Sequence, residues 1–320
     1  MSSGNSTSAD TQINLYGYTP TRSVCYIFVI LYAASTLLHI WQSTRSKAWW
    51  LLPTVVLAGI AEVIGWAARA KSSYEPDARM PYIIQTSILV LAPTPFVAAL
   101  FIGFGRISER LGSEYSRLRP KLYSRIFLTG DLLSLLIQGG GGGIAASALN
   151  DQSKVNLGSR VILVGLIVQL FSMTVFCYMM AEYAFRRFTD RPFRKPDMAS
   201  YAEAAVPMSA RTMDRSMKLL ITGICVSTAL IYIRSIYRII EFSDGYNGKI
   251  AHTQVLFNVF DGMMVTLAMY TLNAMHPGML LRATAGVSAY AMAQTSLTSF
   301  DRRTSPTVPT VEVYQPRLQK

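Results

Sequence analysis

The chain has 320 residues, of which 51% are hydrophobic and only 15% are charged, and its mean hydropathy is +0.30. Soluble domains contain about 25% charged residues, so this composition excludes an ordinary soluble protein and indicates a membrane protein. The net charge of +12 would suggest nucleic-acid binding in a soluble protein, but here short charged stretches separate apolar blocks. We therefore expect the positive charge to mark cytosolic loops, and we expect no nucleic-acid partner.

A helix needs about 20 mostly apolar residues to cross a bilayer. In chain order, the apolar runs predict seven such helices, at 22–42, 48–68, 82–105, 122–148, 161–185, 217–240 and 254–275. The sequence therefore predicts an all-α, polytopic membrane protein with seven transmembrane helices. Most Lys and Arg residues fall in the loops of one side, which predicts an N-terminus outside and a C-terminus in the cytosol.

The predicted helices divide the chain into three parts. Residues 1–21 are expected to form an extracellular tail, residues 22–280 the membrane domain, and residues 281–320, rich in Ser, Thr and Pro, a disordered cytosolic tail. Asn5 begins the only Asn-x-Ser/Thr match in the chain and is a glycosylation candidate under this orientation. The basic loop at 186–215 is expected to lie against the anionic inner leaflet.

Ionisable side chains inside a membrane span are costly, so each is a functional candidate by default. Several of them recur here at helical spacing, which places each set on one helix face. The candidates for binding or translocating a substrate are Glu62, Arg69, Gln85, Asp131, Gln138, Gln169, Arg234, Arg238, Glu241 and Asp261. We prefer a substrate or proton pathway between the helices. The alternative is that these side chains only satisfy one another, with Arg234 paired to Glu62 or Asp261.

Proline and glycine residues interrupt two of the predicted helices. Pro93 in the third predicts a kink or hinge. Gly139 and Gly143, at the ends of a five-glycine run in the fourth, have the GxxxG spacing of close helix packing, which is our preferred interpretation. The alternative is a broken helix whose freed backbone groups line a cavity. The run lacks the Lys-Ser/Thr ending of a phosphate loop, so no nucleotide site is expected.

Signatures of catalysis are missing from the sequence. A three-histidine zinc site would need His39, His252 and His276 on one side, whereas His252 is predicted outside. The chain has no GxSxG, HExxH or Walker motif, and its three cysteines lie in apolar runs without metal-binding spacing. We therefore expect no enzyme activity, no ATPase of its own, no metal and no cofactor.

A series of ordered motifs resembles a known family. The motifs are Glu62-x-x-Gly65-Trp66-x-x-Arg69, Tyr82-Ile-Ile-Gln85, Ala92-Pro93, Gly130-Asp131, Gln138-Gly139-Gly140, Gly165-Leu-x-x-Gln169, Arg234-Ser-Ile-Tyr-Arg238 with Glu241, Asp261, and His276-Pro277-Gly278. Through them, residues 20–280 resemble the fungal RTA-like family, also called the lipid-translocating exporter family. That family consists of seven-helix membrane proteins.

The resemblance implies a protein of the plasma membrane, or else of an endomembrane, that moves or confers resistance to amphipathic molecules. Sphingoid long-chain bases and aminosterols are the implied substrates, and one branch of the family is linked to porphyrin uptake. The partners would be the lipid bilayer and the amphipathic substrate. A hypothesis from another class is a seven-helix sensor of lipid or small-molecule stress.

For the transport hypothesis, the candidate acids have a specific role. Glu62 and Asp261, with Asp131 as a further candidate, would accept the cationic amine of a sphingoid-like amphiphile while its tail stays against lipid. Arg69, Arg234 and Arg238 are then expected to keep these acids ionised when the site is empty.

Overall fold

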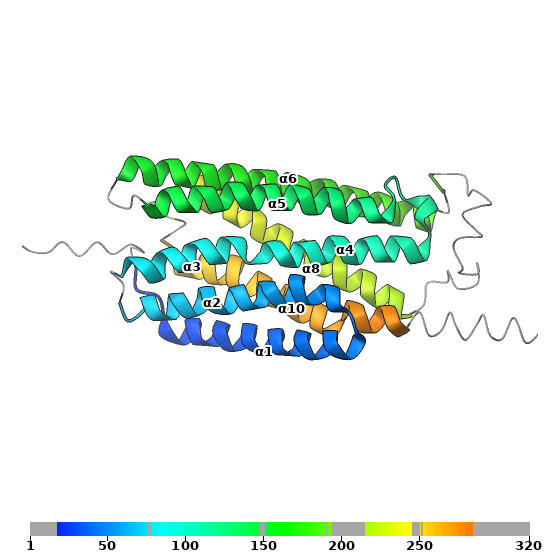
Figure 1. The fold of residues 1–320 in the computed structure, drawn as a ribbon, viewed down its shortest axis with the longest axis horizontal. Coiled ribbons are helices and arrows are strands. Elements are labelled where there is room, and N and C mark those ends of the chain that lie inside the picture. Colours follow the sequence, from blue (N-terminus) through cyan, green and yellow to red (C-terminus); the bar gives the residue numbers. More distant parts are fainter. Residues whose placement is uncertain are drawn as a thin grey trace, which may run out of the picture.

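The computed structural model describes residues 18–75, 78–147, 151–189, 191–193, 215–244, 250 and 252–283. Within these residues all regular structure is helical and there is no strand, which confirms the predicted all-α class. The helices form one elongated bundle whose long elements alternate in direction (Figure 1). The glycosylation candidate Asn5, most of both predicted tails and most of the basic loop lie outside the described residues.

Three long helical elements make up the first part of the bundle. They are α1 (Arg22–Ser46), then the short η1 (Trp49–Leu51) and π-helical η2 (Leu52–Val56) that lead into α2 (Leu57–Ser72), and then α3 (Arg79–Leu91) followed by α4 (Pro93–Leu111). Because Pro93 has no N–H, a regular helix cannot be continued through this point with all its hydrogen bonds. The division between α3 and α4 falls at this proline, whereas the kink or hinge predicted at Pro93 stays a prediction.

The second part begins with a short 3-10 turn and contains the two longest helices. Its elements are η3 (Ser113–Tyr115), α5 (Pro120–Ser147), α6 (Gln152–Phe188) and α8 (Arg215–Ser243), followed by α9 (Gln254–Phe257), π-helical η5 (Asn258–Met263) and α10 (Met264–Ala274). Helix resumes after His276 and continues to Ala283. The five glycines lie inside the continuous helix α5, so the alternative of a broken helix there is wrong.

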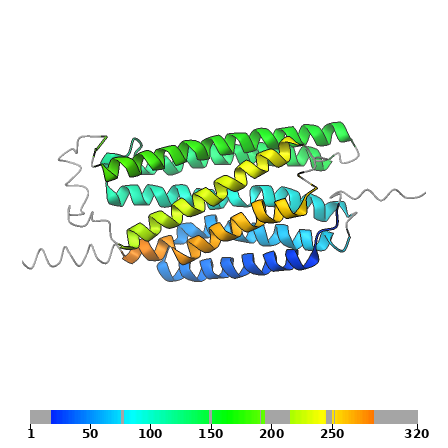
Figure 2. The same ribbon diagram turned by 180° about the vertical axis from the view of Figure 1, so that it is seen from behind.

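Among the described residues, six helical segments are long and apolar enough to cross a membrane. They are Arg22–Ser46, Trp49–Ser72, Arg79–Leu111, Gln152–Phe188, Arg215–Ser243 and Gln254–Ala283. Each corresponds to one of the seven predicted spans. The remaining predicted span corresponds to α5, which has 28 residues but is not among the six. It lies beside α6 (Figures 1 and 2), and the seventh crossing stays a prediction.

The outer surface of the bundle is apolar, as a bilayer requires. Ile30, Leu136 and Phe171 are 65%, 63% and 69% exposed, and many other large apolar side chains also point outward. Exposed apolar area of this extent in water would cause aggregation, whereas against acyl chains it is favourable. Many polar and charged side chains of the membrane-spanning helices lie in the interior of the bundle.

Aromatic side chains pack between α4, α5 and α6. Phe101 and Phe104 on α4 contact Phe176 on α6, with ring centroids 4.6 and 5.5 Å apart, and Phe104 also contacts Tyr123 on α5 at 5.3 Å. Helix α8 crosses the bundle obliquely (Figure 2) and contacts α4, α6 and α10. Its C-terminal turns thereby lie beside α6, toward the end of the bundle where α1 begins.

A polar seam joins α1 to the last helix. The Gln42 side-chain amide donates to the Asn273 backbone carbonyl at 2.9 Å, and the Asn273 side-chain amide donates to the Ser35 hydroxyl at 2.5 Å. The rings of His39 and His276 lie 5.8 Å apart in the same seam. Among the described residues no three His, Cys, Asp or Glu side chains are grouped to hold a metal ion.

Candidate functional site

Helix α8 presents three charged side chains on one face near its C-terminal end. Arg234, Arg238 and Glu241 follow the spacing i, i+4, i+7 and are 1%, 2% and 9% exposed. Because this face is turned into the bundle, the charges are withdrawn from lipid. Such buried charges persist in an apolar interior only where partners neutralise them.

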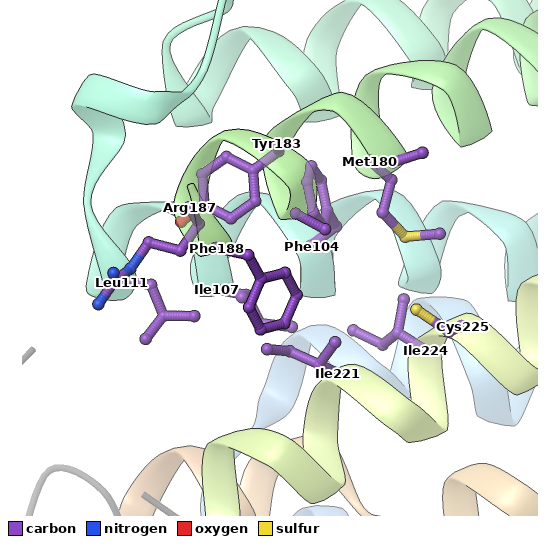
Figure 3. A pocket seen from close by; sticks show the side chains of 12 residues that line it. Phe104, Ile107, Leu111, Met180, Tyr183, Arg187, Phe188, Ile221, Ile224 and Cys225 are labelled. Carbon is purple, nitrogen blue, oxygen red and sulfur yellow. The ribbon is translucent and has the colours of Figure 1, made fainter. Parts of the chain in front are cut away.

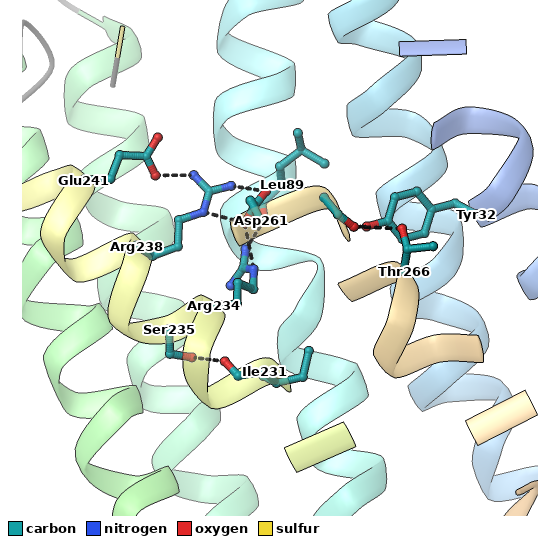
Figure 4. A network of polar contacts seen from close by, with 10 residues as sticks. Tyr32, Leu89, Ile231, Arg234, Ser235, Arg238, Glu241, Asp261 and Thr266 are labelled. Atoms are coloured by element: carbon teal, nitrogen blue, oxygen red, sulfur yellow. Dashed lines mark hydrogen bonds and ion pairs between the residues drawn. The ribbon is translucent and has the colours of Figure 1, made fainter. Parts of the chain in front are cut away.

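Asp261 supplies that partner from the π-helical segment η5 (Figure 4). Its Oδ1 accepts hydrogen bonds from the Arg234 Nε at 2.8 Å and from the Arg238 Nε at 2.7 Å, and its Oδ2 accepts from the Arg238 Nη2 at 2.6 Å. The Arg238 Nη1 also donates to the Glu241 carboxylate at 3.0 Å. Charge-assisted, bidentate hydrogen bonds of this kind are among the strongest in proteins. Arg234, Arg238, Glu241 and Asp261 are called the charge network below.

A backbone carbonyl made available by proline completes the network. The Arg234 Nη2 donates to the Leu89 carbonyl oxygen at 2.7 Å. In an unbroken helix this oxygen would accept from the N–H of residue 93, but Pro93 has none. The interruption between α3 and α4 thus creates the acceptor that the buried guanidinium uses. The network ties together α3, α8 and the last helical segment.

Arg69 on α2 lies close to the charge network, since it contacts the same aromatic ring as Arg238. Its Nη2 donates to the Tyr18 hydroxyl at 2.6 Å, and its guanidinium carbon lies 4.4 Å from the centre of the Phe257 ring. The Arg238 guanidinium carbon lies 5.0 Å from the same ring. Two cations thus contact one aromatic ring, an arrangement favoured by the negative potential of its faces.

Glu62 is buried on α2, at 1% exposure, and interacts electrostatically with Asp261, Arg234 and Arg238. In the described part of the chain it forms no ion pair, in contrast to Asp261. Tyr32 on α1 interacts electrostatically with Glu62 and donates its hydroxyl to the Gly262 carbonyl at 2.7 Å. Glu62 therefore lies beside a neutralised network and carries a carboxylate that the network does not use.

The amides and the third acid predicted in the spans form a separate group on α5 and α6. The Gln138 amide donates to the Gln169 side-chain carbonyl at 2.9 Å and so joins the two helices. This contact fits the alternative that the polar side chains satisfy one another. Asp131 is 1% exposed, and neither of its carboxyl oxygens has a hydrogen-bond partner among the described residues. Gln85 on α3 is 4% exposed. Every predicted polar candidate is thus buried, but they do not all meet in one place.

The glycine that packs closely is not one of the two predicted. A Cβ on Gly139 or Gly143 would meet nothing within 4 Å, whereas a Cβ on Gly141 would lie 2.8 Å from the Gly158 carbonyl oxygen and from the Ile162 nitrogen. The GxxxG interpretation of Gly139 and Gly143 is therefore wrong, because those residues lie on the exposed side of α5. Gly141 instead forms the close backbone contact with α6.

Sequence reasoning missed three parts of the site. Phe257 lies one turn before Asp261, and that spacing was a usable signal for its place beside the arginines. The Leu89 carbonyl follows from the position of Pro93, four residues later. For Tyr18, in the segment before the first helix, the sequence holds no signal of a contact with Arg69.

Comparison with known proteins shows which family the sequence is similar to. A family model described as RTA1 like protein matches residues 55–284. Protein RTA1 of Saccharomyces cerevisiae is 30% identical over 278 residues, which cover 79% of this chain and 81% of that protein. The sphingoid long-chain base transporter RSB1 of the same yeast is 24% identical over 284 residues, 83% of this chain and 74% of that protein.

A further relative matches a shorter stretch. Protein RTM1 of Saccharomyces cerevisiae is 30% identical over 210 residues, which cover 65% of this chain and 62% of that protein. No solved structure matches the chain significantly. Together with the apolar helices, these relationships identify a multi-pass membrane protein.

Proposed function

The chain belongs to the RTA1-like protein family, and we propose that it moves sphingoid long-chain bases, or similar cationic amphiphiles, across the plasma membrane. A relative aligned over most of the chain is named for transport of sphingoid long-chain bases. Such a molecule has a cationic amine and a long hydrocarbon tail. It therefore needs an acid inside the membrane and an apolar surface beside it.

The observation that carries the proposal is Glu62, a buried carboxylate without an ion pair in the described residues, next to the charge network. Asp261 is a poor acceptor for an amine because two guanidiniums already occupy both of its oxygens. We therefore assign the amine to Glu62 and a structural role to Asp261. Arg69 and Arg238 beside Phe257 border the site and disfavour a second cation.

We further propose that α5 is a seventh crossing and that the N-terminus lies outside. The beginning of α1 and the end of the last helix lie at opposite ends of the bundle (Figure 1), as an odd number of crossings requires. At the end where the last helix stops, Arg282 donates to the Arg45 carbonyl at 2.9 Å, and Arg117 pairs with Glu182 at 2.7 Å. A basic end of this kind fits the cytosolic side.

The orientation predicts a labelling pattern. In a variant carrying Lys320→Cys, an impermeant maleimide is expected to label the C-terminus only after the cells are permeabilised. A glycosylation shift that disappears in Asn5→Gln would support the same orientation from the other end. Labelling of Lys320→Cys in intact cells would contradict the proposed orientation.

The substrate site predicts that Glu62→Gln abolishes most transport. Losing an interaction with a charged group removes about 1.5–3 kcal/mol, and about 1.4 kcal/mol corresponds to a tenfold change. We expect the transbilayer movement of a fluorescent sphingoid base, in liposomes containing purified protein, to slow by about tenfold or more. The measurement is made with and without a pH gradient, which separates proton-coupled from passive movement.

The matched control is Glu109→Gln, the same change at an exposed position on α4 at the other end of the bundle. It is expected to transport at the rate of the unmodified protein. Equal rates for Glu62→Gln and Glu109→Gln, with both proteins folded, would remove Glu62 from the mechanism. Absence of movement in every protein would instead show that this substrate class is wrong.

A further inference from the structure

An apolar pocket lies at the end of the bundle opposite the charge network. It is formed where α4, α6 and the beginning of α8 meet (Figure 3), and its volume is about 210 Å³. Ile107 and Leu111 come from α4, Met180 and Phe188 from α6, and Ile221 from α8. A volume below the usual 300–1,000 Å³ of small-molecule sites suits a segment of one hydrocarbon chain.

The pocket opens toward the surface that faces lipid. Phe188 on its rim is 75% exposed, and Cys225, also in its wall, is exposed. An acyl chain can therefore enter from the bilayer without leaving an apolar environment. This distinguishes the pocket from the polar interior around the buried Glu62.

Arg187 brings a positive charge to one edge of the pocket. Figure 3 shows the Arg187 guanidinium at this edge, next to Leu111, while the Tyr183 ring forms part of the wall. This end of α4, α5 and α6 is formed by residues 106–125 and 182–188. Together these residues contain eight Lys or Arg and only three Glu. This excess of positive charge attracts an anionic group and repels the cationic amine of a sphingoid base.

We propose that this pocket binds one acyl chain of an anionic phospholipid, whose headgroup contacts Arg187. The chain fills the space between α4, α6 and α8, and the phosphate lies among the basic side chains at the helix ends. The same lipid thereby bridges three helices at the end of the bundle where α8 begins. The proposal does not depend on which substrate the protein moves.

Native mass spectrometry of the purified full chain tests this lipid site. The protein is incubated with phosphatidylserine or with phosphatidylcholine of identical acyl chains, and retained lipid is counted. We expect phosphatidylserine to be retained about fivefold better, in line with the contribution of one basic residue near an anionic surface. Arg187→Gln is expected to lower phosphatidylserine to the level of phosphatidylcholine. Ala184→Phe, which narrows the pocket, is expected to lower both.

Arg125→Gln is the matched control, since Arg125 is an exposed residue on α5 at the same end of the bundle but outside the pocket. It is expected to keep the lipid preference. Equal retention of the two lipids by the unmodified protein would overturn the proposal. Equal losses in Arg125→Gln and Arg187→Gln would also overturn it, because general attraction to the basic surface would then explain the binding.

The native Cys225 gives a second, local readout. In a protein with Cys25→Ala and Cys177→Ala, modification of Cys225 by N-ethylmaleimide is expected to slow when phosphatidylserine is added. Addition of Ala184→Phe should remove this protection by the lipid. Unchanged reactivity of Cys225 in the presence of bound phosphatidylserine would place the lipid elsewhere and contradict the proposal.

Discussion

Asp261→Asn is expected to destabilise the bundle by about 3–5 kcal/mol, because it leaves two buried guanidiniums with too little negative charge. Arg234 and Arg238 are both almost fully buried and together make three hydrogen bonds to this one carboxylate. Asparagine keeps the size of the side chain but removes the charge and one of the two acceptor oxygens. Glu241, whose hydrogen bond in the described part of the chain is to Arg238, cannot replace it.

The measurement is the melting temperature of purified protein in detergent, followed by size-exclusion chromatography. The matched control is Asp151→Asn at the start of α6, where the ion pair with Lys154 is exposed and where Asn caps the helix as well as Asp. We expect a large fall for Asp261→Asn and almost none for the control. Equal melting temperatures for the two variants would show that the charge network contributes little to stability.

Gly141→Ala is expected to destabilise the protein by about 1–3 kcal/mol, the usual range for overpacking a tight contact. The added methyl group would lie 2.8 Å from both the Gly158 oxygen and the Ile162 nitrogen, and backbone atoms cannot move aside as a flexible side chain can. Helices α5 and α6 would have to separate. Because the two helices contact each other over most of their length, the strain cannot be relieved locally.

Gly139→Ala, two residues away in the same run, provides the comparison. Its methyl group would meet nothing within 4 Å, and Ala favours helix over Gly by about 1 kcal/mol. We expect Gly139→Ala to raise the melting temperature slightly and Gly141→Ala to lower it. The opposite order would mean that α5 is rotated relative to α6 from the arrangement described here.

Much of the fold follows from apolar runs alone, since a bilayer admits few alternatives to helices of about 20 apolar residues. The interruption at Pro93 follows from the missing N–H of proline. The π-helical turns of η2 and η5 do not, because an extra residue in a turn leaves no mark on composition. Nor could the sequence tell Gly141 from its neighbours, as which glycine meets α6 depends on the rotation of α5.

The candidate site was predictable as a set of buried residues, because the membrane expels ionisable groups from contact with lipid. Which of these residues pair with one another was not predictable. Helical spacing placed Arg234 and Arg238 on one face, but which acid meets them depends on how α8 crosses the bundle. Spacing also could not separate Asp261, which is fully engaged, from Glu62, which has no ion pair in the described residues.

The charges of the network sum to zero when Arg234, Arg238, Glu241 and Asp261 are all ionised. The membrane voltage therefore exerts no net force on these four side chains, although each charge alone would experience about 2.3 kcal/mol per 100 mV across the full membrane. A cationic amine entering beside them adds a single positive charge that the voltage does act on. Under the proposed function, the electric field of the cell would then act on the cargo while exerting no net force on the charge network beside Glu62.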